Sequence, residues 1–387
     1  MIVNRRGFLM ATGAMALAAQ AARAASGSRR VVVIGGGIIG ASIAYHLAKT
    51  GAKVTILDKT GPAAGATMCS FAWLNAGSKR PRPYHQMNLL GLLGWHQLQD
   101  ELGIAALPVQ WGGTVDWTAG AKEADQMRAS IARQQAWGYP IRMIEPGDVT
   151  RLLPGITPGA IDAVSFSEVE GTVNPVIATR ALLKAAQAHG AKLEFPVTVT
   201  GFDRIGGKVT RVLTSGGAID CDEIVLAAGL DCQPLAAMLG ANVPIETSLG
   251  VLAHTVPRPM ALPRLAYAPG ANIKQNPDGS YVTGASFAGT PDVKGTREEG
   301  EALLATARRF VPAMRGARLD QVTLGRRVLP KDSFPIVGHL PRVENAYVAA
   351  MHSGMTQAPL IGQVAAVEIL SRTKADLLDT FRPERFA

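Results

Sequence analysis

The chain has 387 residues, a length typical of two or three domains, and 47% of them are hydrophobic while 18% are charged. A composition this apolar can bury a large core, which excludes a globally disordered protein. The formal net charge of +9 is not concentrated in a dense Lys/Arg block beyond the N-terminus, so no nucleic-acid partner is expected, and three cysteines are too few for a disulfide framework.

Residues 1–24 have the features of an export signal. Residues 4–9 (NRRGFL) resemble a twin-arginine motif, residues 8–22 are a short alanine-rich stretch, and residues 22–24 offer a small-x-small cleavage site. The stretch is shorter than the roughly 18–20 apolar residues that span a bilayer. The protein is therefore expected to be periplasmic or secreted by twin-arginine export, a route that carries folded, cofactor-loaded proteins. An uncleaved anchor or a disordered tail is the alternative.

A nucleotide-binding pattern opens the remaining chain. Residues 30–34 (RVVVI) predict a buried strand, residues 35–40 read Gly-Gly-Gly-Ile-Ile-Gly, residues 41–49 have apolar positions at helical spacing, and residues 53–57 predict a second strand before Asp58. This order of strand, Gly-x-Gly-x-x-Gly, helix, strand and acid is typical of a Rossmann-like dinucleotide site. The alternative is a glycine-rich turn in another α/β protein.

Each part of this pattern has a physical role. Gly35 allows the tight turn, Gly37 lets the backbone approach a pyrophosphate, and Gly40 lets the helix pack closely on the strand. The positive end of the helix dipole then faces the phosphates, and Asp58 can accept hydrogen bonds from a ribose diol. The pattern alone does not choose between NAD and FAD. The cofactor contacts expected here are Gly35, Gly36, Gly37, Ile38, Ile39, Gly40, Asp58 and Lys59.

The segments that follow make that choice through a resemblance. Residues 65–77 form a small-residue loop that resembles the flavin-contacting segment of the D-amino-acid oxidase, glycine oxidase and sarcosine oxidase family, the DAO family. Residues 170–175, 192–199, 222–229 and 325–338 resemble later segments of that family in the same order. The resemblance covers almost the whole chain after the export signal, and it implies FAD as the cofactor.

The resemblance also implies an α/β fold, with a Rossmann-like FAD-binding domain and an inserted α+β substrate domain built on an antiparallel sheet. The FAD-binding domain would comprise residues 28–80, 145–234 and 320–387, and the substrate domain residues 81–144 and 235–319. The residue pattern itself predicts helices over residues 89–102, 121–137 and 299–311, strand-like pieces over residues 243–256, 265–274 and 280–287, and a hairpin turn at residues 276–279.

Further flavin contacts follow from the resemblance. Val199 matches a position whose backbone touches adenine in the family. Cys69 stands where relatives of the dimethylglycine-dehydrogenase type attach flavin through a histidine, but a small buried side chain beside non-covalent FAD is the favoured interpretation. Cys221 and Cys232 flank one predicted strand and are expected to be unpaired. The implied contacts are Ala66, Thr67, Met68, Cys69, Val199, Ala228, Gly229, Gly354, Met355, Thr356 and Gln357.

The expected chemistry is carried by flavin, so the protein groups need only position the substrate. No G-x-S-x-G or H-E-x-x-H pattern occurs, and the seven histidines lack metal-ligand spacing, so neither a hydrolase nor a metal site is expected. The basic run at residues 79–82 either lines a passage between the two domains or is a solvated face.

Two residues are candidates for the catalytic site. Arg327 matches the family's carboxylate-binding arginine, whose planar guanidinium holds a carboxylate through two hydrogen bonds, while Arg326 would point to the opposite face. The alternative is that both are surface charges. His352 either bonds the flavin or substrate or packs within its loop. The backbone amides of residues 354–357, at a helix start, would stabilise negative charge on a reduced flavin.

Together these features predict an exported FAD-dependent oxidoreductase that oxidises an amine or an amino acid, such as a D-amino acid, glycine or a sarcosine-like compound. Hydride transfer to flavin would give an imine that hydrolyses, and oxygen or a respiratory chain would reoxidise the flavin. A flavin hydroxylase of related fold is one alternative, although that class usually has a Gly-Asp pair where His352, Ser353 and Gly354 stand. A non-catalytic or electron-transfer flavoprotein is the other.

Overall fold

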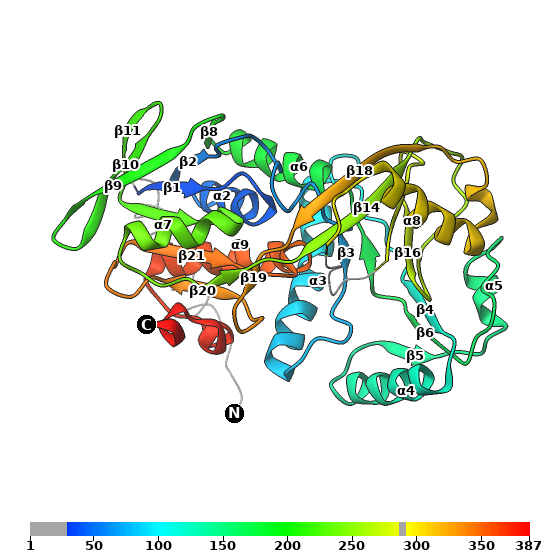
Figure 1. Ribbon diagram of the computed structural model, residues 1–387. Coiled ribbons are helices and arrows are strands. Elements are labelled where there is room, and N and C mark those ends of the chain that lie inside the picture. The colour runs from blue at the N-terminus through cyan, green and yellow to red at the C-terminus, as the bar shows by residue number, and fades with distance from the viewer. Residues whose placement is uncertain (1–28, 286–291) are drawn as a thin grey trace, which may run out of the picture.

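A six-stranded sheet forms the first half of the fold in this computed structural model, which describes residues 29–285 and 292–387. Neighbouring strands are parallel, except that β20 at one edge of the sheet is antiparallel to β21. Figure 1 shows this sheet beside a second sheet that forms the other half. The strands of the first sheet, in spatial order, are β20 (Ile336–His339), β21 (Ala346–Ala350), β12 (Glu223–Leu226), β1 (Arg30–Ile34), β2 (Lys53–Leu57) and β8 (Lys192–Glu194).

Both faces of this sheet are buried, which explains why β1 is continuously apolar. Val31 and Val33 belong to one hydrophobic cluster, and the alternate residues Val32 and Ile34 belong to another on the opposite face. The first face is covered by α2 (Ile38–Lys49), α3 (Arg82–Leu102), α6 (Pro175–Ala188) and α9 (Gly354–Ser371); the second is covered by α7 (Cys232–Met238) and a small sheet of β9 (Val199–Ile205), β10 (Lys208–Thr214) and β11 (Gly217–Asp220).

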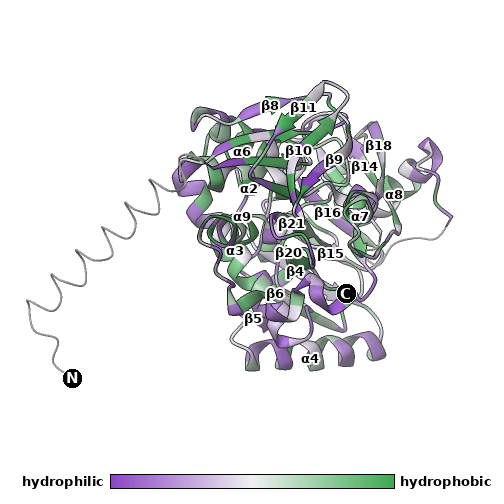
Figure 2. Cartoon of the chain, turned by 90° about the vertical axis from the view of Figure 1, so that its left-hand side faces the viewer, coloured by the Kyte–Doolittle hydropathy of each residue, from purple (hydrophilic) through white to green (hydrophobic). Residues whose placement is uncertain are grey.

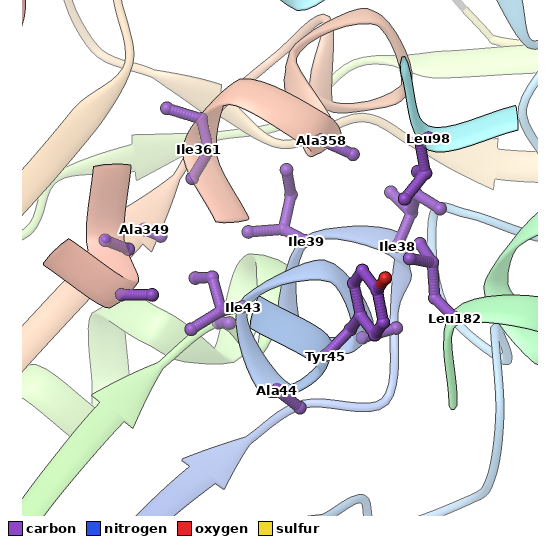
Figure 3. Close-up of a cluster of buried hydrophobic side chains, with 14 of the residues drawn as sticks. Ile38, Ile39, Ile43, Ala44, Tyr45, Leu98, Leu182, Ala349, Ala358 and Ile361 are labelled. Carbon is purple, nitrogen blue, oxygen red and sulfur yellow. The ribbon is translucent and has the colours of Figure 1, made fainter. Parts of the chain in front are cut away.

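Helix α2 is the centre of the first cluster. Figure 3 shows its residues Ile39, Ile43 and Tyr45 among side chains that α3, α6 and α9 contribute. Gly362 of α9 allows this packing, because a Cβ there would lie 2.3 Å from Oγ of Ser42 in α2. The burial of α2 on all sides fixes its N-terminus at the end of β1.

The second half of the fold is an eight-stranded sheet, antiparallel except for one parallel pair, β4 with β15. One face packs against α8 (Arg297–Phe310), which begins with a capping box formed by Thr296 and Glu299. The strands, in spatial order, are β18 (Leu319–Arg326), β14 (Leu249–Thr255), β17 (Tyr281–Gly284), β16 (Ala271–Gln275), β15 (Leu265–Ala268), β4 (Thr114–Thr118), β6 (Ala163–Ser167) and β5 (Ile141–Met143).

Shorter elements complete the chain. Helix α4 (Ala121–Ala136) packs on β6 and lies at the rim of the molecule, where Figure 2 shows hydrophilic residues along it. The others are α5 (Asp148–Leu152), the pairs β3 (Trp73–Leu74) with β7 (Gly171–Thr172) and β13 (Ile245–Glu246) with β19 (Leu329–Pro330), and the 3-10 helices η1 (Gly229–Asp231), η2 (Pro312–Met314), η3 (Asp376–Phe381) and η4 (Pro383–Phe386).

The α/β fold with two sheets agrees with the expected class, and three details differ from the predicted elements. The piece predicted over residues 265–274 is a hairpin of β15 and β16 that turns at Gly270. Strands β6 and β18 join the eight-stranded sheet, although the predicted boundaries place their residues in the FAD-binding domain. Helix α3, predicted in the substrate domain, packs against α9.

Two further features concern the cysteines and the lengths of the helices. All three cysteines are free thiols. Within residues 29–285 and 292–387, no helix has the length and apolarity to cross a bilayer. The predicted export signal at residues 1–24 and the end of the strand predicted over residues 280–287 lie outside the described residues.

Candidate functional site

The glycine-rich turn after β1 forms a tightly packed cradle. Gly35 has a φ of +120°, and a Cβ there would lie 2.3 Å from the carbonyl oxygen of Ala227. A Cβ on Gly40 would lie 1.9 Å from the carbonyl oxygen of Gly35, so α2 approaches the turn as the glycine pattern predicts. Gly37 caps α2, whose first turn carries no acidic residue, so the amides that follow Ile38 at this helix start suit an anion.

The carboxylate of Asp58 ties this turn to the end of β2. Its Oδ2 accepts a 2.7 Å hydrogen bond from the amide of Gly36, and its Oδ1 accepts bonds of 2.8 Å and 3.0 Å from the amides of Thr60 and Gly61. Lys59 beside it forms an exposed 2.6 Å ion pair with Asp231, which follows β12. The ends of β2 and β12 are thus linked across the end of β1.

A cavity of about 820 Å³ extends from this cradle to the eight-stranded sheet. A volume in this range is typical of ligand and cofactor sites. The cavity brings together most of the residues predicted from the sequence. Those that line it are Gly35, Gly37, Ile38, Ile39, Asp58, Lys59, Ala66, Thr67, Cys69, Ala228, Gly229, Arg327, His352, Gly354, Met355 and Thr356.

Five predicted cofactor residues lie elsewhere. The amide of Gly36 donates to Asp58, and Gly40 packs against the carbonyl oxygen of Gly35. Met68 is 45% exposed. Val199 begins β9 and packs on the second hydrophobic cluster. Gln357 is fully buried in α9.

The small-residue loop before β3 closes one wall of the cavity. Oγ1 of Thr67 accepts a 3.2 Å hydrogen bond from the amide of Ile38, which fixes the loop against the N-terminus of α2. Cys69 follows, and a Cβ on Gly325 would lie 2.7 Å from its Cβ. Burial raises the pKa of the Cys69 thiol, so this thiol is a poor nucleophile. The geometry agrees with a non-covalent contact.

Arg327 also lines the cavity, just after β18 and two residues beyond Gly325. Its amide donates a 2.9 Å bond to the carbonyl oxygen of Ser248, and its Nη2 lies 2.9 Å from where a Cβ of Gly250 would stand. Gly250 therefore leaves the space that the guanidinium occupies. Burial lowers the pKa of Arg327, which indicates partial desolvation. Arg326 also lines the cavity but is exposed.

His352 lies within reach of the charges of Arg327 and of Lys79, a lysine that the sequence did not single out as catalytic. Burial, followed by the charges of Lys79 and Arg327, lowers the pKa of His352 to about 4, so its imidazole is neutral near pH 7. Lys79 belongs to the basic run at residues 79–82, and it lines the cavity, as the first of the two interpretations of that run requires. Two cationic side chains and a neutral imidazole thus face one end of the cavity.

Acidic residues that were not predicted as site residues also line the cavity. Glu170 is 2% exposed and accepts hydrogen bonds of 2.6 Å from Tyr139 and 2.7 Å from Trp73. Asp116 of β4 lines the cavity nearby. The signal for Asp116 was present in β4 (TVDWT), where polar residues alternate with Val115 and Trp117 of the buried cluster.

These residues fit FAD. The cradle, the anion-attracting start of α2 and Asp58 suit the dinucleotide part. The start of α9, where Ser353 has a φ of 53° and makes no side-chain cap, presents free amides to the cavity and suits a flavin that gains negative charge. Among residues 29–285 and 292–387, no group of three or more His, Cys, Asp and Glu side chains is placed to hold a metal ion.

Comparisons with known proteins agree with this geometry. The profile of the DAO family, described as FAD dependent oxidoreductase, matches residues 30–367. An opine oxidase subunit of Agrobacterium tumefaciens (strain Ach5) is 27% identical over 379 residues, covering 92% of this chain and 97% of that protein. Glycine oxidase of Bacillus licheniformis is 25% identical over 367 residues, covering 92% and 96%. The crystal structure of glycine oxidase from Geobacillus kaustophilus superposes with a TM-score of 0.83 at 24% identity, covering 92% and 98%.

Proposed function

Because the chain belongs to the DAO family of FAD-dependent oxidoreductases, we propose that it oxidises the carbon–nitrogen bond of an amino acid or N-substituted amino acid. Bound FAD would supply the hydride acceptor. The observation that carries the proposal is the half-buried guanidinium of Arg327 in the cavity, above Gly250. Two similar proteins, a glycine oxidase and an opine oxidase subunit, have names that agree with an amino-acid substrate.

Arg327 would bind the substrate carboxylate. A planar guanidinium holds both carboxylate oxygens at once, and this two-pronged contact fixes the direction of the substrate's Cα–H bond. Partial desolvation of Arg327 strengthens the contact, because fewer water molecules compete for either charge. Orientation and binding therefore come from one side chain.

His352 would hold the substrate nitrogen in its reactive form. A neutral imidazole offers one ring nitrogen as an acceptor, which suits an amine N–H donor. The nearby charges of Lys79 and Arg327 disfavour a protonated amine at this end of the cavity. The neutral amine then loses hydride without a strong general base, and the resulting imine hydrolyses to a carbonyl compound and ammonia or an amine.

The proposal is tested by mixing the holoenzyme anaerobically with a panel of amino acids, their enantiomers, their N-methyl forms and matched amines without a carboxylate. Bleaching of the flavin absorbance reports reduction. Carboxylate-bearing substrates are expected to bleach it, whereas the matched amines are not. Equal bleaching by both groups would contradict the role of Arg327.

The proposal also covers how the protein is exported and which acceptor reoxidises the flavin. The charged start and the cleavage site in residues 1–24 support export by the twin-arginine route, with a mature N-terminus near Ala25. Mass spectrometry of protein recovered from the periplasm checks the N-terminus, and retention of Arg5 and Arg6 would count against cleavage. Parallel assays of oxygen uptake and of quinone-analogue reduction show which acceptor reoxidises the flavin.

A further inference from the structure

A row of polar side chains crosses the cavity face of the eight-stranded sheet. Strand pairing places Ser165 opposite Asp116, Asp116 opposite Tyr267, and Tyr267 opposite Asn272. All four line the cavity. The residues on either side of Asp116, Val115 and Trp117, belong instead to the cluster on the opposite face, so the strand period directs Asp116 toward the cavity.

The row is incomplete without a ligand. The side-chain carboxylate of Asp116 makes no hydrogen bond or ion pair with any residue in the described ranges, whereas the neighbouring carboxylate of Glu170 is bonded by Tyr139 and Trp73. Asn272 is 2% exposed, and its Oδ1 is buried without a hydrogen-bond partner within those same ranges. Buried polar groups are normally paired, so the oxygen of Asn272 indicates that a polar group enters this part of the cavity, where the half-buried carboxylate of Asp116 can also contact it.

Two aromatic rings lie on the same side of the cavity as Asp116, and one of them, Tyr267, is its partner on the neighbouring strand. The rings of Trp73 and Tyr267 lie 5.6 Å apart between centroids and tilt by 43°, and both residues line the cavity. A carboxylate next to aromatic faces is the environment that cations prefer, because the faces carry negative charge and exclude water. An anionic group would be repelled by the carboxylate, and a purely apolar group would leave it unpaired.

We propose that Asp116, beside Tyr267 and the Trp73 ring that packs on it, binds a second, cationic group of the substrate, an ammonium or a guanidinium, distant from Arg327. This inference rests on the proposed function, since it takes Arg327 as the carboxylate site. The substrate class is then a basic amino acid or an N-substituted derivative of one.

The geometry sets the length of this substrate. Gly250, beneath Arg327, is on β14, and β17, β16 and β15 separate β14 from β4. Four strand intervals correspond to roughly 19 Å along the sheet. The side chains of Arg327 and Asp116 shorten this span, leaving a length that glycine cannot bridge and that the side chain of lysine or arginine can.

Protonation of Asp116 adds a pH dependence. Burial and then the charge of Glu170 raise the pKa of Asp116 to about 7. The other titratable groups on this side of the cavity are Tyr267, whose pKa is raised by burial and by Asp116, and Glu170, whose pKa is raised by burial. The charge of Glu170 also acts on Lys79, whose pKa is lowered by burial. Only ionised Asp116 attracts a cation, so preference for a cationic ligand is expected above about pH 7 and is expected to decline as the pH falls below that value.

The test uses non-oxidisable probes on the FAD holoenzyme. The probe 5-guanidinopentanoate carries a carboxylate and a guanidinium, and 5-ureidopentanoate is its neutral isostere. Neither has an α-amine, so perturbation of the flavin spectrum reports binding without turnover. The guanidino probe is expected to bind at least about tenfold more tightly than the ureido probe, because only the guanidinium can form a charge-assisted hydrogen bond with Asp116. Asp116→Asn should remove that difference.

The control is Glu168→Gln, an exposed carboxylate after β6, which should leave the preference intact. Equal binding of the two probes to the parent enzyme, undetectable binding of both, or an equal loss for both in Asp116→Asn would overturn the inference. Arginine and norleucine in the anaerobic bleaching assay separate the two proposals. If the probes show the preference but no amino acid bleaches the flavin, the proposed function alone fails.

Discussion

The amide of Gly36 donates a 2.7 Å hydrogen bond to Oδ2 of Asp58, which joins the turn after β1 to the end of β2. The carboxylate also receives the amides of Thr60 and Gly61. The acid that the nucleotide-binding pattern assigns to the ribose therefore has a second role, which is to hold the backbone of the cradle in place.

Replacing Asp58 should weaken FAD binding. Asp58→Ala removes a charged acceptor, at a cost of about 1.5–3 kcal/mol, or roughly ten- to hundredfold in affinity. Asp58→Asn keeps one acceptor oxygen and should lose less. Titration of apoprotein with FAD, followed by flavin fluorescence, measures both, with Asp203→Asn, a half-buried aspartate on β9 that does not line the cavity, as the control. An unchanged dissociation constant for Asp58→Ala would show that this carboxylate supports neither the cradle nor the ribose.

The C-terminal segment is anchored by a buried ion pair. Arg382 donates bonds of 2.7 Å and 2.8 Å to the two oxygens of Glu368, and the side chains are 8% and 1% exposed. Arg382→Ala leaves a buried carboxylate without its partner and should lower the free energy of unfolding of the apoprotein by about 3–5 kcal/mol. Lys374→Ala, which breaks an exposed pair with Glu384, should cost about 0–1 kcal/mol. Urea denaturation compares them, and equal losses would contradict this account.

This pair also predicts a dependence on pH. Burial alone would raise the pKa of Glu368, but its bonds to Arg382 hold that pKa below the ordinary value of 4.5. The pair therefore contributes its full stabilisation at pH values above the ordinary 4.5. Its contribution is lost as the pH falls through the lower pKa that Glu368 has in the folded state. The difference in stability between the parent protein and Arg382→Ala should narrow in acid.

Features that depend on local sequence were easier to predict than features that depend on contacts between distant parts of the chain. The order from β1 to Asp58 was predictable because each step depends on neighbours in sequence. The turn at Gly270 was missed because the apolar residues on both sides read as one strand. The role of Asp116 depends on which face of β4 lines the cavity, and strands distant in sequence decide that. Lys79 was noticed only as part of a basic run, since its approach to His352 is a tertiary contact.

The thiol of Cys69 should not carry the flavin. Burial raises its pKa, so the nucleophilic thiolate is scarce near pH 7. Cys69→Ser is expected to retain FAD, and acid precipitation of the parent protein should release all of it to the supernatant. A flavin mass that remains on the peptide containing Cys69 would overturn this prediction.

The central claim is that Arg327 binds the carboxylate of the substrate beside the flavin. The most direct measurement is the rate of anaerobic flavin reduction, against substrate concentration, in the parent enzyme, Arg327→Ala, Arg327→Lys and the adjacent Arg326→Ala. Leaving a desolvated carboxylate without its partner costs about 2–5 kcal/mol, so Arg327→Ala should lose roughly thirtyfold or more in reduction efficiency with FAD content unchanged. Arg327→Lys should recover part of the loss, because it restores the charge without the two-pronged geometry, and Arg326→Ala should stay near the parent. Reduction of Arg327→Ala by amino acids at the parental rate and affinity would contradict the account.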